Sequence, residues 1–448
     1  MCDSDDMLKK AAELLERQTP LLPRQELDAF VGSFLERRDV FLRARAEHGS
    51  PLYLIEEEVL LNRAREFTAA FRRELPDVRV YYALKSNNHP SVAGTLAEAG
   101  LGLDVSSGPE LQLALQCRAT SIIFTGPGKT EEELGLAVEN RERVTILMDS
   151  FGELERLERV AACAGADVRV GVRLTTQEHG LWRKFGIRLS HLSRFAAAAE
   201  QCPHVHLCGL HFHTSWNLTP SNHVRFIRRL GSALRKMPQD WLSTIEFVDI
   251  GGGFWPPRGE WLQPAGTPEG QVCLAVGSAP ETGLRHHKFS SVPIEEFADR
   301  IAKALRAYVF PCVRCRVYTE PGRWICNDAM HLILTVVDKK AKDLVITDAG
   351  INAVGWDRFE SDYFPVINLS RPDLNEHECY IMGSLCTPHD IWGYAYYGAD
   401  IQVGDVLMIP TQGAYTYSLR QNFIKPVPKT AMLKSDRWLR LDSCPSVL

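Results

Sequence analysis

Long apolar runs are absent from this sequence: nothing in it approaches the roughly 18 consecutive apolar residues of a membrane-spanning helix. The segment Met1–Lys10 is acidic and polar, so it lacks the basic start of a secretory signal. A strong excess of charge is also missing, because the formal net charge is −5. That value gives no reason to expect a nucleic acid or an anionic membrane as a partner. We therefore expect a cytoplasmic globular protein that binds neither.

Cysteine pairs are nearly absent as well. The twelve cysteines are scattered along the chain, and the single Cys-x-x-Cys pair is formed by Cys312 and Cys315. One such pair cannot supply the four ligands of a structural zinc site, and it lies in an apolar run typical of a buried strand. Without a secretion signal the thiols are expected to be reduced. We predict no metal site.

The central part of the chain alternates between two patterns. A chain of 448 residues is too long for one compact core and indicates two domains. The predicted strands are Val78–Lys85, Gly100–Val105, Ser121–Thr125, Val144–Asp149, Val168–Leu174, Leu207–His213, Ile245–Ile250 and Val313–Glu320. The predicted helices between them include Pro109–Cys117, Thr130–Glu139, Phe151–Ala164 and Pro293–Tyr308. This alternation favours an α/β fold with a parallel sheet, and the strand count favours a closed TIM-type (β/α)8 barrel.

The flanking parts of the chain lack this alternation. The predicted domains are an N-terminal helical extension (1–48), the barrel (49–322) and a C-terminal antiparallel β-domain (323–448). The extension carries helical patterns at Asp6–Gln18 and Arg24–Glu47. Strands of the β-domain are expected at His331–Asp338, Leu344–Thr347, Tyr380–Met382 and Val406–Pro410. The Pro- and Gly-rich segment Trp255–Val292 shows no periodicity and is predicted as a long loop, such as a lid or an interface element.

Polar residues and glycines gather where the predicted barrel strands end. They are Lys85, Asp104, Gly126, Asp149, Arg173, His213, Gly251 to Gly253, and Glu320. Catalytic groups of such barrels lie at the carboxyl ends of the strands. The sequence therefore predicts an active site at this end of the barrel.

Several of these residues suit a cofactor that carries an aldehyde and a phosphate. A lysine in a desolvated pocket, as predicted for Lys85, can form a Schiff base. The glycines 251–253 let backbone N–H groups approach a phosphate, and Glu320 and Arg323 can meet a ring nitrogen and a phosphate. Simpler interpretations exist as well. Lys85 could be a surface lysine, and the glycines 251–253 could form an ordinary turn. His213, which could stack on an aromatic ring, could instead be a core histidine.

The order and spacing of many short motifs give a more specific indication. They are Tyr-Ala-Leu-Lys-Ser-Asn (82–87), Gly-Leu-Asp-Val-Ser-Ser-Gly-Pro-Glu-Leu (102–111), Lys-Phe-Gly-Ile (184–187), Gly-Leu-His-Phe-His (209–213), Asp-Ile-Gly-Gly-Gly (249–253), Glu-Pro-Gly-Arg (320–323), Cys-Thr-Pro-His-Asp (386–390) and Gly-Ala-Tyr (413–415). Over about residues 50–426 the chain resembles the ornithine/diaminopimelate/arginine decarboxylase family, which depends on pyridoxal 5'-phosphate (PLP). That family combines an alanine-racemase-type barrel of fold type III with a β-domain.

The resemblance implies roles for individual residues. Lys85 holds the cofactor covalently, His213 stacks on its pyridine ring, and Glu320 pairs with the protonated ring nitrogen. The phosphate is held by Gly251, Gly252, Gly253, Arg323 and Tyr415, and Asp104 and Arg173 are expected to belong to the same cofactor site. A carboxylate such as Glu320 keeps the ring an effective electron sink. The resemblance therefore implies a decarboxylase that gives an amine and CO2, rather than a racemase.

The β-domain contributes a second predicted catalytic residue. In similar enzymes the loop that carries Cys386 reaches the active site of the partner subunit in a head-to-tail homodimer. Cys386 would then protonate the α-carbon after CO2 has left. We therefore expect a homodimer with shared active sites, in which the catalytic residues are Lys85, His213 and Cys386.

The substrate side chain is less well indicated. Diaminopimelate decarboxylases usually have an arginine and a tyrosine where this chain has Trp356 and Glu360, and a glutamate where it has Thr387. Diaminopimelate is therefore an alternative that requires Arg358 to act as a substitute. Glu360 and Asp362, near the place of an acidic residue in ornithine-type enzymes, would suit the terminal amine of ornithine, lysine or arginine.

Other substrate classes stay open. The Cys-Thr-Pro-His-Asp loop, with Asp390 as a further candidate for substrate binding, resembles enzymes that act on siderophore precursors or carrier-linked amino acids. Trp216, Trp255 and Trp392 lie near site motifs and would widen the pocket for such a conjugate. An amino-acid racemase and a non-catalytic, decarboxylase-like regulator are the remaining alternatives.

Overall fold

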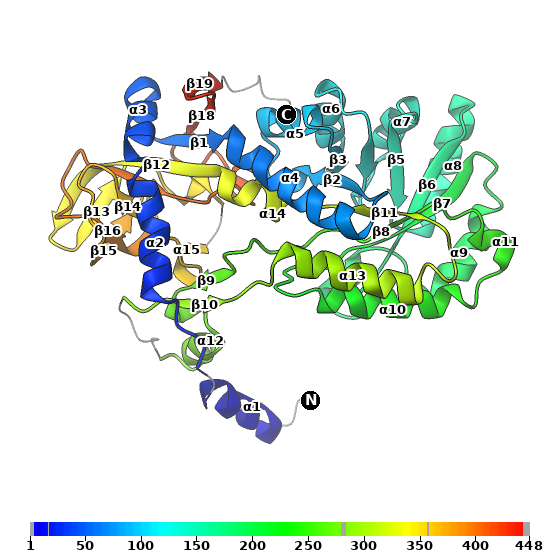
Figure 1. Ribbon diagram of the computed structural model, residues 1–448, viewed down its shortest axis with the longest axis horizontal. Coiled ribbons are helices and arrows are strands. Elements are labelled where there is room, and N and C mark those ends of the chain that lie inside the picture. The colour runs from blue at the N-terminus through cyan, green and yellow to red at the C-terminus, as the bar shows by residue number, and fades with distance from the viewer. Residues whose placement is uncertain (1–3, 17, 279–283, 356–357, 442–448) are drawn as a thin grey trace. The chain divides into compact units, whose positions relative to one another are not determined.

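The computed structural model describes residues 4–16, 18–278, 284–355 and 358–441 of the chain (Figure 1). The chain folds into two compact units. The barrel unit consists of residues 58–257 and 292–326. The sheet unit consists of the described residues up to 57, residues 258–291, and the described residues from 327 onward.

The barrel unit contains a closed barrel of parallel strands, as predicted. Its order is β11-β2-β3-β4-β5-β6-β7-β8. The strands are β2 (Arg79–Ala83), β3 (Gly102–Val105), β4 (Ile122–Phe124), β5 (Val144–Met148), β6 (Val168–Leu174), β7 (Val205–Phe212), β8 (Phe247–Asp249) and β11 (Arg316–Thr319). Apolar residues with high strand propensity dominate them, because both faces of a barrel strand are buried.

Helices follow the strands and lie outside the barrel (Figure 1). They are α4 (Glu57–Glu74), α5 (Pro90–Glu98), α6 (Gly108–Gln116), α7 (Glu131–Glu139), α8 (Phe151–Ala164), α9 (Leu192–Ala199), α10 (Ser221–Leu234), α11 (Gln239–Leu242), α13 (Ile294–Tyr308) and α14 (Arg323–Cys326). Thr130 forms a capping box with Glu133 at the start of α7, which confirms the predicted helix start. Ser150 caps α8 in a related way, accepting a hydrogen bond from the backbone N–H of Glu153.

Large side chains fill the inside of the barrel. Tyr81, Ile123, Leu147, Cys208, Phe247 and Tyr318 form one buried cluster. The rings of Phe247 and Tyr318 stack at 4.5 Å between centroids. A side chain at Gly209 would overlap the ring of Phe247, so β7 needs a glycine there to admit that ring.

The sheet unit contains one sheet with the order β13-β15-β16-β14-β17-β12-β1-β18-β19. Its strands are β1 (Leu52–Glu56), β12 (Met330–Ala341), β13 (Leu344–Thr347), β14 (Ile367–Asn368), β15 (Glu376–Met382), β16 (Ile391–Tyr397), β17 (Val406–Ile409), β18 (Lys429–Lys434) and β19 (Arg437–Leu441). The pairs β1–β18, β13–β15 and β14–β16 are parallel. The predicted β-domain is therefore present, but its sheet is mixed rather than antiparallel.

The observed unit boundaries differ from the predicted ones at both ends of the barrel, and residues 258–291, predicted within the barrel domain, belong to the sheet unit. β1 precedes the barrel in the sequence yet lies between β12 and β18 of the sheet unit, where Leu52, Tyr53, Leu54 and Ile55 are fully buried. At the other end α14 belongs to the barrel unit, so the sheet unit resumes at residue 327 rather than 323. Long-range pairing of β1 is the physical reason for the first difference.

The segment predicted as a loop between residues 255 and 292 contains regular structure. β9 (Glu260–Leu262) and β10 (His287–Phe289) form an antiparallel pair, and α12 (Pro268–Ala275) lies between them. Bridges join this segment to Leu21 and Asp362, and Glu269 accepts two hydrogen bonds from Thr19. The segment is therefore part of the sheet unit.

The N-terminal helices also belong to the sheet unit. They are α1 (Ser4–Glu16), α2 (Arg24–Leu35) and α3 (Arg38–His48). The single pattern predicted over Arg24–Glu47 is thus two helices, with a turn at Glu36 and Arg37. Leu27, Val31 and Phe41 pack in one core cluster with Trp261 and Ile333.

Two further features concern the cysteine pair and the length and composition of the helices. Cys312 and Cys315 are half-buried in the loop between α13 and β11 rather than in a strand, and the cysteines of the described ranges are free thiols. None of the helices in those ranges combines the length and apolar composition that crossing a membrane requires.

Candidate active site

Lys85 lies at the mouth of the barrel. It belongs to a short 3-10 helix (Leu84–Ser86) that directly follows β2, and its Nζ is 2.7 Å from Oδ2 of Asp104 at the end of β3. Asp104 is fully buried and also accepts a hydrogen bond from Thr125. Burial and the nearby Glu320 raise the pKa of Asp104. The structure thus brings together an accessible amine and a carboxylate that readily takes up a proton.

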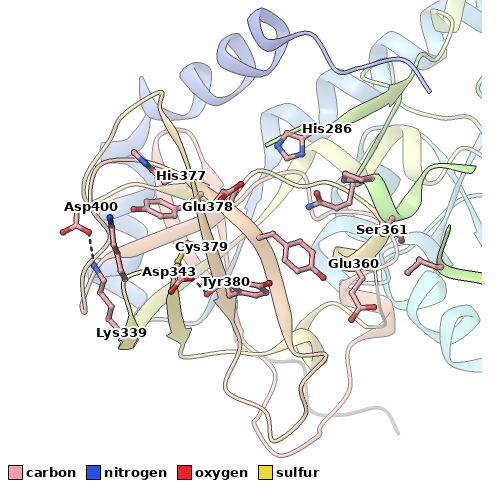
Figure 2. A pocket seen from close by; sticks show the side chains of 18 of the residues that line it. His286, Lys339, Asp343, Glu360, Ser361, His377, Glu378, Cys379, Tyr380 and Asp400 are labelled. Carbon is pink, nitrogen blue, oxygen red and sulfur yellow. Dashed lines mark hydrogen bonds and ion pairs between the residues drawn. The ribbon is translucent and has the colours of Figure 1, made fainter. Parts of the chain in front are cut away.

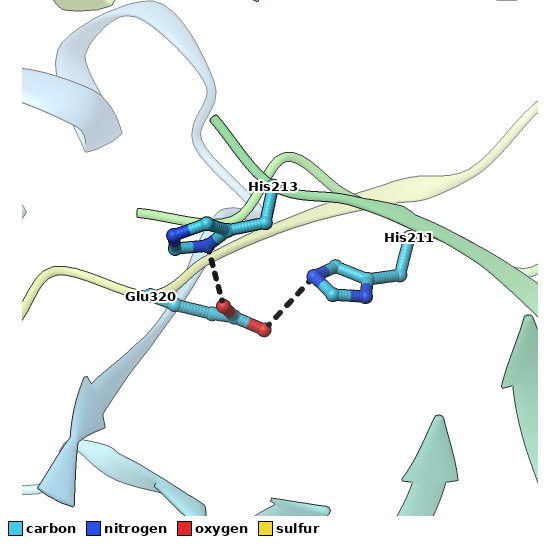
Figure 3. A group of neighbouring side chains, drawn as sticks. All are labelled: His211, His213 and Glu320. Carbon is cyan, nitrogen blue, oxygen red and sulfur yellow. Dashed lines mark hydrogen bonds and ion pairs between the residues drawn. The ribbon is translucent and has the colours of Figure 1, made fainter. Parts of the chain in front are cut away.

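Glu320 faces two histidines inside the same mouth (Figure 3). Its carboxylate oxygens lie 3.3 Å from His211 Nε2 and 3.3 Å from His213 Nδ1. Burial lowers the pKa of His213 to about 4. Burial alone would raise the pKa of Glu320, but His211, His213 and Lys85 hold it well below its ordinary value. The carboxylate is therefore charged near neutral pH, and the imidazole of His213 is neutral.

His211 was not among the predicted site residues. The Gly-Leu-His-Phe-His motif contained the signal, because residues two apart on a strand point to the same face. The ligand atoms of His211, His213 and Glu320 lie within 4.8 Å of one another, which is a spacing that could hold a metal ion. Glu320 Oε1 accepts no hydrogen bond from the described residues, so it is equally suited to a protonated ring nitrogen.

The three glycines form a tight turn beside these side chains. Gly251 and Gly253 have φ values of +68° and +84°, which disfavour other residues. A Cβ atom at Gly251 would lie 2.6 Å from the carbonyl oxygen of Phe212, and one at Gly252 would overlap that of Glu320. The turn therefore packs backbone directly against the strand ends of His213 and Glu320.

Arg173 lies in the wall of the barrel mouth. Its guanidinium is 4.4 Å from the ring centroid of Phe185 in the Lys-Phe-Gly-Ile motif, and its Nε is 4.0 Å from Asp149 Oδ1. Asp149 also accepts a hydrogen bond of 2.9 Å from the backbone N–H of Gly186. Arg173 is 8 % exposed, so its positive charge is directed at the interior of the site.

Arg323 is the first residue of α14 and follows Glu320 closely. Its guanidinium carbon lies 4.6 Å from the ring centroid of Trp255 and 5.9 Å from that of Trp216. The residues of the predicted set that belong to the barrel unit are Lys85, Asp104, Arg173, His213, Gly251, Gly252, Gly253, Glu320 and Arg323.

The remaining predicted residues belong to the sheet unit. Cys386 is exposed in the loop between β15 and β16, and Tyr415 follows β17 with φ of +58°. Asp390 is buried, and its carboxylate accepts hydrogen bonds of 2.7 and 2.6 Å from the backbone N–H groups of Ile351 and Leu385. Asp390 therefore holds the loop that carries Cys386.

One substrate candidate of the sheet unit, Glu360, lines a large cavity (Figure 2). The cavity has a volume of about 1620 Å³, and its lining includes Glu360, Ser361, Tyr380 and His286. The carboxylate of Glu360 lies 2.7 Å from Nδ1 of His389, and both side chains are exposed. Asp362 is half-buried and bridged to Leu262. Trp356 and the side chain of Arg358 lie outside the described residues.

Comparison with known proteins agrees with this geometry. The family described as "Pyridoxal-dependent decarboxylase, pyridoxal binding domain" matches residues 61–264. The chain is 25% identical to the diaminopimelate decarboxylase of Aquifex aeolicus, over 92% of this chain and 91% of that protein. It is 26% identical to the L-glutamyl-[BtrI acyl-carrier protein] decarboxylase of Niallia circulans, over 82% of this chain and 85% of that protein.

A solved structure shares the fold. The crystal structure of diaminopimelate decarboxylase from M. jannaschi superposes with a TM-score of 0.75 at 24% identity, covering 90% of each chain. Residues 61–264 thus match a pyridoxal-dependent decarboxylase domain and the relatives named above are decarboxylases, so the chain is an enzyme that uses PLP to decarboxylate an amino acid.

The residues at the barrel mouth fit this cofactor. Lys85 offers an amine, Glu320 offers a charged carboxylate whose Oε1 makes no hydrogen bond within the described residues although His211 Nε2 lies 3.3 Å away, and the glycine turn brings backbone without side chains up to the strand ends of His213 and Glu320. A metal ion would account for the histidines and Glu320, but it would leave Lys85 and the turn unexplained.

Proposed function

We propose that the chain decarboxylates an α-amino acid whose side chain carries an amide-linked or carrier-type group, and that it does so as a homodimer. The observation that carries the decarboxylation chemistry is the close group of Lys85, Asp104, His213 and Glu320 within one barrel mouth. Bound PLP supplies an electron sink for the pair of electrons that CO2 leaves behind. The chain's own residues provide the remaining functions.

Lys85 and Asp104 provide the anchoring amine and its proton acceptor. An amine bonds to a carbonyl carbon only when it is unprotonated. Asp104 Oδ2 lies 2.7 Å from Lys85 Nζ, and burial raises the pKa of this carboxyl. A proton can therefore move from Nζ to Asp104 within one hydrogen bond.

Glu320 and His213 set the charge around the cofactor ring. The carboxylate of Glu320 is ionised because its pKa is held well below the ordinary value, so it favours a protonated ring nitrogen. His213 is neutral at physiological pH, since burial lowers its pKa to about 4. A neutral imidazole at His213 would not oppose the positive charge of a ring held beside it.

Cys386 is the proposed proton donor to the α-carbon. Its exposure and its position in a loop fixed by Asp390 support this role. We infer that the loop acts in the active site of the partner subunit, as in the head-to-tail dimers that the sequence resembles. The homodimer is part of this proposal.

The substrate class is inferred from which residues are already occupied. Glu360, a candidate for binding a terminal amine, is paired with His389, which weakens the case for free ornithine, lysine or arginine. The relative that acts on a carrier-linked glutamyl group supports a conjugate. Diaminopimelate is the second candidate, because most of the relatives are named for it.

Release of CO2 by PLP-loaded protein tests the proposed function. The panel consists of L- and D-ornithine, lysine, arginine, glutamate, meso-diaminopimelate, and ornithine and lysine acylated on the side-chain nitrogen. We expect release from an acylated compound. The highest activity with meso-diaminopimelate would favour the second candidate, and the highest with a free basic amino acid would make Asp362 the leading partner for its amine.

A further inference from the structure

The sheet unit contains the cavity of about 1620 Å³ shown in Figure 2. Its lining includes His286, parts of the segment 263–274, and residues of the strands β12, β15 and β16, all of which belong to the sheet unit. Apart from the candidate Glu360, the chemistry proposed above uses none of these residues. Pockets for small molecules usually measure roughly 300–1,000 Å³, so this cavity has room for a long organic ligand.

Gln263 places an unused hydrogen-bonding group in the wall of this cavity. It directly follows β9, and only 6 % of the residue is exposed. Its backbone N–H donates to the carbonyl of Ser361 at 2.9 Å, and its carbonyl accepts from the N–H of Gly266 at 2.9 Å. The side-chain amide makes no hydrogen bond within the described residues. A buried amide without a partner is costly, and this one is available to a ligand in the cavity.

His286 provides a second unpaired group beside the first. Leu262 pairs with His287 across β9 and β10, so Gln263 and His286 are the next residues along the two strands. His286 Nε2 lies 2.8 Å from Oε1 of Glu376. An ionised carboxylate only accepts hydrogen bonds, so Nε2 carries the hydrogen and Nδ1 is the acceptor of the neutral ring. Nδ1 makes no hydrogen bond within the described residues, and His286 is 5 % exposed.

The charged residues of the lining have an excess of negative charge. They comprise four carboxylates and two lysines, namely Asp343, Glu360, Glu378, Asp400, Lys339 and Lys342. Lys339 lies 2.9 Å from Asp400 and is thus paired. Asp343 and Glu378 make no ion pair within the described part of the chain. Such a lining repels phosphates and carboxylates and attracts cations.

Two tyrosine rings add a further preference for a cation. The ring centroids of Tyr380 and Tyr394 are 5.7 Å apart, with 82° between the planes, and both rings are partly open to solvent. Burial and the nearby carboxylate of Glu360 raise the pKa of Tyr394, so a negative charge stands close to this ring. The face of a tyrosine ring attracts an ammonium group. The cavity therefore combines acceptors, carboxylates and aromatic faces, which together suit an organic amine.

We propose that this cavity of the sheet unit is a binding site for an aliphatic polyamine. One end of the ligand donates hydrogen bonds to Gln263 and His286. Its other ammonium groups lie beside Asp343, Glu378 and the ring of Tyr394. The ligand belongs to the same chemical class as the amine that a decarboxylase releases, and the site goes beyond the proposed function because it does not depend on which amino acid is the substrate.

Binding of spermidine to the PLP-loaded enzyme tests this site. The enzyme is first reduced with borohydride, which turns the bond between cofactor and lysine into a stable amine, so that an added amine can no longer react there. Isothermal titration calorimetry then compares spermidine with 1,8-octanediol, an uncharged chain of the same length. We expect spermidine to bind about tenfold more tightly than the diol. Equal affinities, or no binding of spermidine, would overturn the proposal.

Two double variants with the same change in net charge locate the binding. Asp343→Asn with Glu378→Gln removes the unpaired carboxylates of the lining and should raise the Kd of spermidine about tenfold. Asp338→Asn with Glu36→Gln alters exposed residues of the sheet unit outside the lining and should keep the Kd within about twofold of the wild type. Equal Kd values for the two double variants would mean that only the overall charge attracts spermidine, which contradicts the site.

Gln263→Leu tests the buried end of the cavity. Leucine has a similar size but no amide, so the variant removes the unpaired group and should raise the Kd of spermidine roughly tenfold. An unchanged Kd in this variant would show that the ligand does not reach Gln263 and would contradict the proposed placement. Failure of the proposed function is distinct, since no compound of the CO2 panel would then be decarboxylated while spermidine would still bind.

Discussion

At the scale of single residues, burial decides which groups of the barrel unit carry charge. Burial and the charge of Glu320 raise the pKa of Asp249 well above its ordinary value, while the neighbours of Glu320 hold its own pKa low. The pKa values of these two nearby carboxyl groups are thus shifted in opposite directions, so that Asp249 is neutral and Glu320 is ionised. Burial also lowers the pKa of His223 to about 3, and this residue braces the glycine turn through a contact of 3.1 Å with the carbonyl of Gly252.

The histidine at 223 should make stability depend on pH. In the unfolded chain its pKa is near 6.5, so between pH 6.5 and about 3 the unfolded state binds more protons than the folded state. The free energy of unfolding should therefore fall as the pH is lowered through this window, by at most about 1.4 kcal/mol per pH unit from this residue. His223→Asn, which keeps a donor, should show a flatter dependence in urea titrations.

His206→Asn is the control, because His206 is an exposed histidine of the same barrel unit, on β7. Its stability curve should parallel that of the wild type. Parallel curves for His223→Asn and the wild type would show that His223 titrates normally in the folded protein.

At the scale of elements, one buried ion pair joins the loop after β4 to α8. Lys129 Nζ donates to Glu153 at 2.7 Å and to the carbonyl oxygens of Gly126 and Leu147. Both side chains of the pair are almost fully buried. Glu153 in turn accepts a hydrogen bond from the backbone N–H of Asp149, so the pair fixes the end of β5, where Asp149 faces Arg173.

Removing one member of this pair should be strongly destabilising. Lys129→Met leaves Glu153 as a buried charge without its partner, which should lower the free energy of unfolding by about 3–5 kcal/mol. The double variant Lys129→Met with Glu153→Leu should recover much of that loss. Urea unfolding measures both.

An exposed ion pair between α7 and α8 provides the comparison. Arg159 and Glu131 are 2.7 Å apart, with both side chains about 60 % exposed (61% and 59%), so Arg159→Met should cost about 0–1 kcal/mol. A loss of the same size in Lys129→Met would contradict the role of burial.

At the scale of the whole molecule, the account requires residues of two different units to act in one reaction. Lys85 belongs to the barrel unit and Cys386 to the sheet unit. In a head-to-tail homodimer each active site would combine Lys85 of one chain with Cys386 of the other. This arrangement can be tested by mixing variants that are inactive alone.

Lys85→Ala and Cys386→Ala should each give little CO2. When the two are unfolded and refolded together, random pairing puts about half of the chains in mixed dimers, each with one intact site. Activity should rise to about a quarter of the wild-type value. Mixtures no more active than the separate variants would exclude shared sites, and a mixture of Lys85→Ala with Glu320→Gln, both from the barrel unit, should recover none.

Much of the barrel unit could be predicted because its signals are local. Strand and helix patterns alternate, and Lys85, Glu320 and the glycines stand directly at strand ends. Pairings between distant segments could not be predicted in this way. The position of β1 within the sheet unit and the parallel pairs of the mixed sheet depend on contacts that no local pattern encodes.

Other features were missed because their residue types suggest ordinary structure. His211 reads as a core histidine, and the turn at Glu36 and Arg37 lacks the glycine or proline that usually ends a helix. The strained backbone of Trp216 is set by the hydrogen bonds of Asn217 to another loop. A backbone conformation of this kind depends on contacts made in the folded protein, so a local sequence pattern cannot predict it.

The most direct test of the central claim is to map where the cofactor is attached. PLP-loaded protein is reduced with borohydride and digested, and the peptides are analysed by mass spectrometry. The account predicts the pyridoxyl mass on the peptide that contains Lys85, with no corresponding label in Lys85→Ala. A label on another lysine, or an unlabelled protein that still releases CO2, would contradict it.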